Sequence, residues 1–145
     1  MMKTYKIVVI DGQGGKIGRL LIEQLKAAAL PVPYEVFAIG TNSTATTAML
    51  KAGADWGATG ENPVVVACRD ADIVIGPLGI VCADSLLGEV TPAMALAVGQ
   101  CPAPKVLLPI NRCNHFVVGV QPMPVAEQIA LAVQQTEQLL QEMIK

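Results

Sequence analysis

Apolar and polar residues alternate in blocks along the chain, and these blocks predict strands and helices in turn. Four apolar blocks rich in Val, Ile and Leu predict strands at 6–10, 34–39, 72–76 and 105–110. A further short strand is predicted within 53–58, where the chain lies between glycines. Largely apolar runs of this kind are typical of parallel strands that helices cover on both faces.

Helical patterns follow most of these strands. The first predicted helix covers 14–28, and the second runs from the capping residues at 41–44 to about Ala52. Asn62 and Pro63 favour a short third helix, although the three valines that follow are also compatible with a strand. Further helices are predicted from Thr91-Pro92 to about Gln100, and from Pro124 to the end. The inward stripe of the last helix is formed by Val125, Ile129, Val133, Thr136, Leu140 and Met143.

The apolar run FVVGV at 116–120 predicts one more strand. Only residues 111–115 separate it from the strand at 105–110, which is too few for a helical crossover. We therefore predict that these two strands form an antiparallel hairpin at the edge of the sheet. The whole pattern predicts a single domain over 1–145. Its fold class is α/β, a three-layer Rossmann-like sandwich with a mostly parallel sheet and a C-terminal helix.

Composition and charge narrow the classes of function. The 145 residues are 52% hydrophobic but only 3% aromatic, so Val, Ile, Leu and Ala form the core. A net charge of −2 gives no general attraction to nucleic acid or to an anionic membrane. The longest apolar run, 73–83, is shorter than the ~20 residues that span a bilayer. No signal peptide and no C-x-x-C pair occur, so we expect a cytoplasmic protein without disulfides or a metal site.

The turn after the first strand carries the motif that is most informative about function. In DGQGGKIG, Gly12, Gly15 and Gly18 have G-x-x-G-x-x-G spacing. Gly12 permits a tight turn, Gly15 lets a backbone N–H approach a phosphate, and Gly18 allows close packing of the helix on the strand. The helix N-terminus adds free N–H groups for an anion. We therefore predict that NAD(P) or a related adenine nucleotide contacts Gly12, Gln13, Gly14, Gly15, Lys16, Ile17 and Gly18.

The end of the second strand lacks the acidic residue that holds the ribose 2′-hydroxyl of NAD in this fold. Thr41 and Asn42 stand after Gly40 instead, and their hydroxyl and amide groups suit a 2′-phosphate. No arginine stands beside them, so the sequence favours neither NAD nor NADP. A second interpretation is that Thr41 and Asn42 only cap the following helix.

Asp11 is a second departure from the usual pattern. Its carboxylate precedes the phosphate-binding turn and would repel a pyrophosphate unless Lys16 or a bridging Mg²⁺ ion offset its charge. The alternative is that Asp11 accepts hydrogen bonds from the amides of the turn and stiffens it.

Other candidate residues follow the strands at the same predicted edge of the sheet. Gly76, Pro77 and Asn111 are expected to line a ligand there, and Arg112 suits a carboxylate or phosphate group. Cys113 is a candidate nucleophile with His115 as its base, or else an inert small hydrophobe. Candidate acid or base groups are also offered by Asp84 and Glu89, which could equally be solvated surface residues.

The absence of several sequence motifs excludes the enzyme classes that depend on them. The chain has no Tyr-x-x-x-Lys pair, no G-x-S-x-G nucleophile turn and no Walker G-K-[ST]. Short-chain dehydrogenase chemistry is therefore not predicted.

Six segments together resemble one bacterial family, the one catalogued as domain of unknown function 3842. They are IDGQGGKIG, GTNSTATTAMLKAGA, GATGEN, ADIVIGPLGI, DSLLGEVTP and INRCN, and the resemblance covers about Lys6 to Val120. The resemblance implies a small cytoplasmic Rossmann-like protein and leaves the reaction open.

Three functions fit these observations. The first is a minimal Rossmann domain that binds NAD(P) or a related adenine nucleotide, with a second small ligand near Arg112 and any redox step completed by a partner or second subunit. The second is a non-catalytic nucleotide-sensing or interaction subunit, and the third is an enzyme that uses Cys113. A homodimer is expected, because so short a chain cannot easily enclose a dinucleotide and because Leu131 lies off the inward stripe of the last helix.

Overall fold

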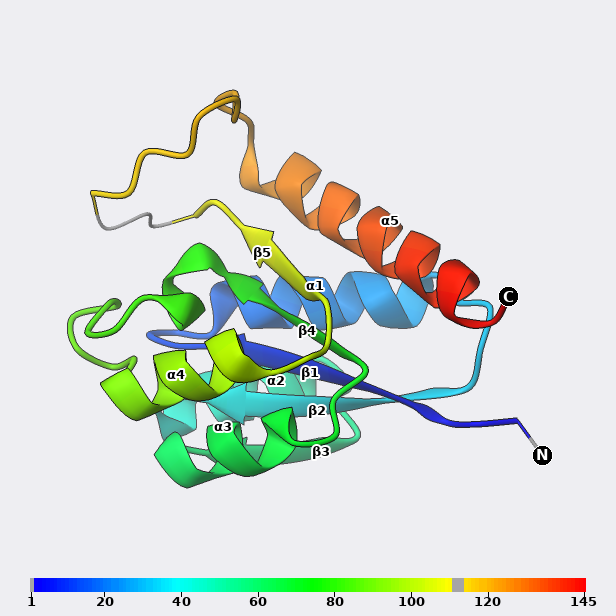
Figure 1. Ribbon diagram of the computed structural model, residues 1–145, viewed down its shortest axis with the longest axis horizontal. Helices are drawn as coiled ribbons and strands as arrows, with labels where there is room; N and C mark the ends of the chain where they lie inside the picture. The colour runs from blue at the N-terminus through cyan, green and yellow to red at the C-terminus, as the bar shows by residue number, and fades with distance from the viewer. Residues whose placement is uncertain (1, 111–113) are drawn as a thin grey trace.

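Five parallel strands form the centre of the computed structural model, which describes residues 2–110 and 114–145 (Figure 1). The strands lie in the order β3-β2-β1-β4-β5, so β1 is at the centre and the chain extends the sheet first to one side and then to the other. This is the order expected of a Rossmann fold. The strands are β1 (Tyr5–Asp11), β2 (Tyr34–Gly40), β3 (Trp56–Thr59), β4 (Ile73–Pro77) and β5 (Lys105–Leu108).

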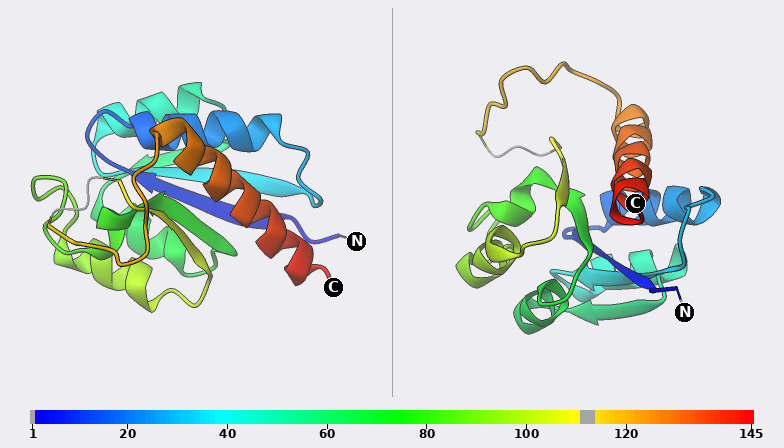
Figure 2. Two further views of the ribbon diagram at one scale, coloured as in Figure 1. Left: turned by 90° about the horizontal axis from the view of Figure 1, so that it is seen from above. Right: turned by 45° about the vertical axis from the view of Figure 1, so that its right-hand side comes forward.

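In the described part of the chain, five helices and one short 3₁₀ turn connect and cover the strands. One face of the sheet carries α1 (Lys16–Ala27), α2 (Ser43–Lys51) and α5 (Val125–Met143), and the other carries α3 (Glu61–Cys68) and α4 (Pro92–Gln100). The 3₁₀ turn η1 (Leu78–Val81) directly follows β4. The two views in Figure 2 show the helices on either side of the sheet and thus the three predicted layers.

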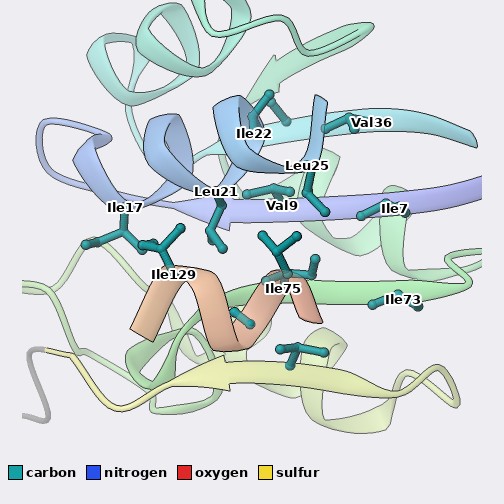
Figure 3. Packing of buried hydrophobic residues seen from close by; sticks show 14 of the residues in the cluster. Ile7, Val9, Ile17, Leu21, Ile22, Leu25, Val36, Ile73, Ile75 and Ile129 are labelled. Carbon is teal, nitrogen blue, oxygen red and sulfur yellow. The ribbon is translucent and has the colours of Figure 1, made fainter. Parts of the chain in front are cut away.

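Side chains alternate between two cores along the central strand. Ile7 and Val9 of β1 point toward α1 and α5, whereas Val8 and Ile10 point toward α3 and α4. All four are at most 2% exposed, which explains the absence of polar residues from this run. Figure 3 shows Leu21 of α1 among the buried residues that pack between α1, α5 and the sheet.

The structure agrees with most of the predicted elements. The ambiguous stretch 53–58 ends in β3, and the segment after Asn62 is a helix rather than a strand. Thr136, which lies on the predicted stripe of the last helix, is fully buried and donates a hydrogen bond to the carbonyl of Ala132. None of the described helices is long and apolar enough to cross a membrane.

The predicted antiparallel hairpin is wrong. No strand forms in the described segment 114–124, and the sheet is entirely parallel. β5 ends before Pro109, which has no N–H to continue a strand ladder, and Gly119 has φ of 87°, which interrupts an extended chain. The segment 114–124 runs out from the body of the protein and returns at the start of α5 (Figure 1). Phe116 and Val118 are therefore 88% and 99% exposed.

Candidate functional site

The glycine turn lies at the point where the strand order reverses. β1 pairs with β2 on one side and with β4 on the other, so Asp11 and Pro77 end neighbouring strands that lead to opposite halves of the sheet. In open parallel sheets, ligands bind outside the carboxyl ends of the strands at this point. The turn is closed by a 2.9 Å hydrogen bond from the amide of Gly15 to the carbonyl of Gly12.

The glycines of the motif are required by neighbouring protein groups. Gly15 has φ of 75°, and a Cβ placed on it would lie 2.8 Å from Cα of Ala45 in α2. Gly18 faces the side chain of Met49, also in α2. A Cβ on Gly12 would lie 2.5 Å from Oγ1 of Thr41. The spacing of the motif therefore allows α2 and the end of β2 to approach the turn closely.

Asp11 is bound by the turn that follows it. Its side chain is only 4% exposed, and its two oxygens accept hydrogen bonds of 2.8 and 2.7 Å from the amides of Gly12 and Gly18. Burial raises the pKa of this carboxyl, while those hydrogen bonds act in the opposite direction and the charge of Glu89 adds to the rise. Asp11 thus stiffens the turn, as the second interpretation of this residue predicted.

This arrangement does not fit a Mg²⁺ ion bridging Asp11 and a phosphate. Both carboxylate oxygens are directed at backbone amides and the group is nearly excluded from solvent. Lys16, the other candidate for offsetting the charge, is exposed at the start of α1 and lines a groove between α1 and α5.

Glu89 joins the glycine turn to the end of β2. Its Oε1 atom accepts three hydrogen bonds, from the amide of Gln13 (2.8 Å), Oγ1 of Thr41 (2.6 Å) and Nδ2 of Asn42 (2.8 Å). We call these three groups the donor cluster. Burial alone would raise the pKa of Glu89, but the donors outweigh it and hold the pKa below its usual value. The carboxylate is therefore held in its charged form.

Asn42 has two roles in this arrangement. Its Oδ1 atom accepts a hydrogen bond from the amide of Ala45 and so caps α2, as the capping interpretation predicted. Its Nδ2 atom contributes to the donor cluster and also donates to the carbonyl of Gln13 at 2.9 Å. Thr41 makes no such cap, because its hydroxyl is directed to Glu89.

Two amides of the turn have no hydrogen-bond acceptor among residues 2–110 and 114–145. Within the described part of the chain, the backbone N–H groups of Gly14 and Lys16 make no hydrogen bond, whereas those of Gly12, Gln13, Gly15 and Gly18 all do. A Cβ on Gly14 would meet nothing within 4 Å. This side of the turn is therefore open to a ligand that accepts hydrogen bonds.

Comparison with known proteins identifies the family. The family model described as "Domain of unknown function (DUF3842)" matches residues 6–141. The chain belongs to this family. No curated protein matches the sequence. A solved structure with 15% sequence identity is described as a dodecameric FMN-dependent UbiX-like decarboxylase from Escherichia coli O157:H7. The match covers 98% of this chain and 95% of that chain, with a TM-score of 0.42.

In this member of the DUF3842 family, some of the other predicted site residues are buried in the protein core, one is exposed, and some lie outside the described residues. Gly76 faces the carbonyl of Ile10, so it serves the close pairing of β4 with β1, and Pro77 is buried beside it. Ile17 is buried in the core next to α5, which leaves only its backbone near the turn. Asp84 is exposed and lies outside the donor cluster. The predicted ligand residues Asn111 and Arg112 and the candidate nucleophile Cys113 lie outside the described residues.

Among the described residues, no group of three or more His, Cys, Asp or Glu side chains is arranged to hold a metal ion.

The most informative residue, Glu89, was predicted only as a candidate acid or base. Its contact with Gln13 spans 76 positions of sequence, and no spacing rule connects the two. The only available signal was its location in a long loop at the ligand-binding edge of the sheet.

Proposed function

We propose that this protein is a minimal Rossmann domain that binds NAD(P) or a related adenine nucleotide at the glycine turn. The observation that carries this proposal is the donor cluster, in which groups from the turn and from the end of β2 converge on one carboxylate oxygen. In the Rossmann fold, these two segments hold the pyrophosphate and the adenosine ribose. The position of the donor cluster between these two segments therefore supports ribose binding beside it.

The open side of the turn supports the same proposal. The amides of Gly14 and Lys16, which have no acceptor among the described residues, and the positive end of α1 suit the negative charge of a pyrophosphate. The ammonium group of Lys16 is exposed at the same end of α1. The sequence also predicts a second small ligand near Arg112, a residue outside the described part of the chain.

A thermal-shift panel tests the proposal with NAD, NADH, NADP, NADPH and ATP. A nucleotide present at 100 times its Kd stabilises the fold by about 2.7 kcal/mol. For a domain of this size, we expect Tm to rise by roughly 5–10 °C. No shift with any of the five nucleotides would contradict nucleotide binding.

A pair of variants at Gly14 localises the effect. Gly14→Asp places a carboxylate beside the open amides without a steric clash, so the nucleotide-induced shift should disappear while the protein remains folded. Gly14→Asn has nearly the same shape without the charge and should retain most of the shift. Gly15→Asp is a poor choice, because any side chain there would clash with α2. Equal shifts in both Gly14 variants would place the nucleotide elsewhere.

A second candidate function is a non-catalytic nucleotide-sensing or interaction subunit. The observation that favours it is the exposed apolar segment around Phe116 and Val118, together with half-exposed Leu131 on α5. Exposed apolar patches on soluble proteins commonly mark contact sites for other proteins. The absence of a thermal shift with all five nucleotides would favour this second candidate function.

A further inference from the structure

The end of β2 is supplied with a carboxylate by a distant loop. Gly40 ends β2, and neither Thr41 nor Asn42 after it is acidic. Glu89, from the loop between η1 and α4, brings its carboxylate to this position by bonding to both Thr41 and Asn42. The acidic group that the sequence lacked at the end of β2 is therefore present in space.

The loop that carries Glu89 is held by its own hydrogen bonds. Ser85 is buried and its hydroxyl donates to the carbonyl of Gly79, and the amide of Glu89 donates to the carbonyl of Leu86 at 3.1 Å. Leu86 is 4% exposed, and its side chain packs against Gly12 of the glycine turn. Leu86 and Leu87 both adopt left-handed backbone conformations, with φ of 54° and 56°. Apolar packing on the turn thus fixes the loop that positions Glu89.

The two oxygens of Glu89 have different surroundings. Oε1 accepts all three hydrogen bonds of the donor cluster, whereas Oε2 accepts none from the described residues. A carboxylate oxygen in this situation suits the hydroxyl groups of a ribose, which can donate to it. A phosphate at the same place would meet a negative charge that is fixed by three donors.

We propose that Glu89 is the residue that determines which nucleotides bind, because it accepts hydrogen bonds from an unmodified ribose diol and repels a 2′-phosphate. This inference rests on the proposed nucleotide-binding function. It assigns the chain to NAD-type ligands rather than NADP-type ligands. It also gives Asn42 a function beyond capping and Thr41 a function in place of capping, because both orient the carboxylate that would contact the ribose.

Calorimetric titration of NAD and NADP into the full chain tests this assignment, because the two ligands differ only in the 2′-phosphate. The wild type should bind NAD more tightly than NADP. Glu89→Gln removes the charge with little change of shape, so the ratio of the Kd for NADP to the Kd for NAD should fall by about tenfold or more. Glu89→Ser, which also removes the bulk of the side chain, should lower the ratio at least as far. Glu142→Gln, an identical charge change on the exposed last turn of α5, should leave the ratio unchanged.

The outcomes separate this inference from the proposed function. If NAD and NADP both bind but the ratio is the same in the wild type and both folded Glu89 variants, Glu89 does not determine specificity and the proposed function still stands. A wild type that prefers NADP would also overturn the assignment. If neither ligand binds the wild type, the proposed function fails and the inference fails with it. Thermal melting of each variant establishes that it is folded.

Discussion

At the scale of single residues, two carboxylates accept hydrogen bonds from backbone amides of the glycine turn. Asp11 is buried and stiffens the turn from within, and Glu89 links it to the end of β2. The environment raises the pKa of Asp11, chiefly through burial, and lowers that of Glu89, because its donors outweigh the effect of burial. The two groups therefore contribute to the pH dependence of stability with opposite signs.

The lowered pKa of Glu89 predicts how the free energy of unfolding depends on pH. A lowered pKa in the folded state means that its hydrogen bonds stabilise the protein above the ordinary pKa of 4.5, and that this stability is lost as the pH falls through the lowered value. We expect the difference in free energy of unfolding between wild type and Glu89→Gln to be constant near neutral pH and to shrink below about pH 4.5. Urea unfolding over this pH range measures it.

Asp11 is common to both proteins in that comparison, so most of its contribution cancels. By itself Asp11 acts in the other direction, since a raised pKa favours the fold as the pH falls toward the ordinary value of 3.8. A difference between wild type and Glu89→Gln that stays constant throughout the acid range would contradict the hydrogen-bonded carboxylate described for Glu89.

How well single residues could be predicted depended on the sequence distance of their partners. The capping role of Asn42 and the hydrogen bonds of Asp11 involve residues within seven positions, and sequence patterns describe such local contacts. The approach of Glu89 to Thr41 spans 48 positions and depends on how one long loop folds back over the turn. No periodicity specifies that path.

At the scale of elements, the glycine motif controls the packing of α1 on α2. A methyl group on Gly18 would collide with the buried side chain of Met49, so we expect Gly18→Ala to destabilise the protein by about 1–3 kcal/mol. Met49→Ala alone should cost about 2–5 kcal/mol because it leaves a cavity. In the double variant the new methyl group enters the space left by Met49, so its cost should be smaller than the sum of the two.

Chemical unfolding of the four proteins gives this coupling energy. Gly99→Ala is the matched control, since Gly99 lies in α4 with nothing within 4 Å of the added methyl group. It should be neutral or stabilising by up to about 1 kcal/mol, through helix propensity alone. Additive costs at Gly18 and Met49 would mean that the two residues do not touch.

The elements themselves were largely predictable, and the exception has a physical cause. Buried runs such as 73–77 must lie in the interior whatever their partners are, so hydrophobicity identifies them. The run at 116–120 is equally apolar but is exposed, because Pro109 and the left-handed Gly119 prevent it from pairing with β5. Hydrophobicity alone predicts that an apolar segment is buried, but it does not show whether the chain provides a surface to bury it.

At the scale of the whole molecule, the exposed apolar segment predicts self-association. Phe116 and Val118 are almost fully exposed, and half-exposed Leu131 lines a groove of about 360 Å³ between β5 and α5. We expect a homodimer in solution, and Phe116→Ser together with Val118→Ser should weaken it. Multi-angle light scattering across a concentration series measures the association.

The control for the dimer is Leu87→Ser, because Leu87 is 96% exposed but lies in the loop near the glycine turn. This change should leave the molecular mass unaffected. A wild-type protein that remains a 15.2 kDa monomer at high concentration would contradict the predicted dimer.

A ¹⁵N-resolved NMR titration of the chain with NAD shows whether a nucleotide binds at the glycine turn. The largest shifts should occur at the amides of 12–18 and of Thr41, Asn42 and Glu89, with Gly14 and Lys16 among the most affected. Residues of α4 on the far face should remain unchanged. Shifts confined to the groove between β5 and α5, or no shifts at saturating NAD, NADP and ATP, would contradict nucleotide binding at this turn.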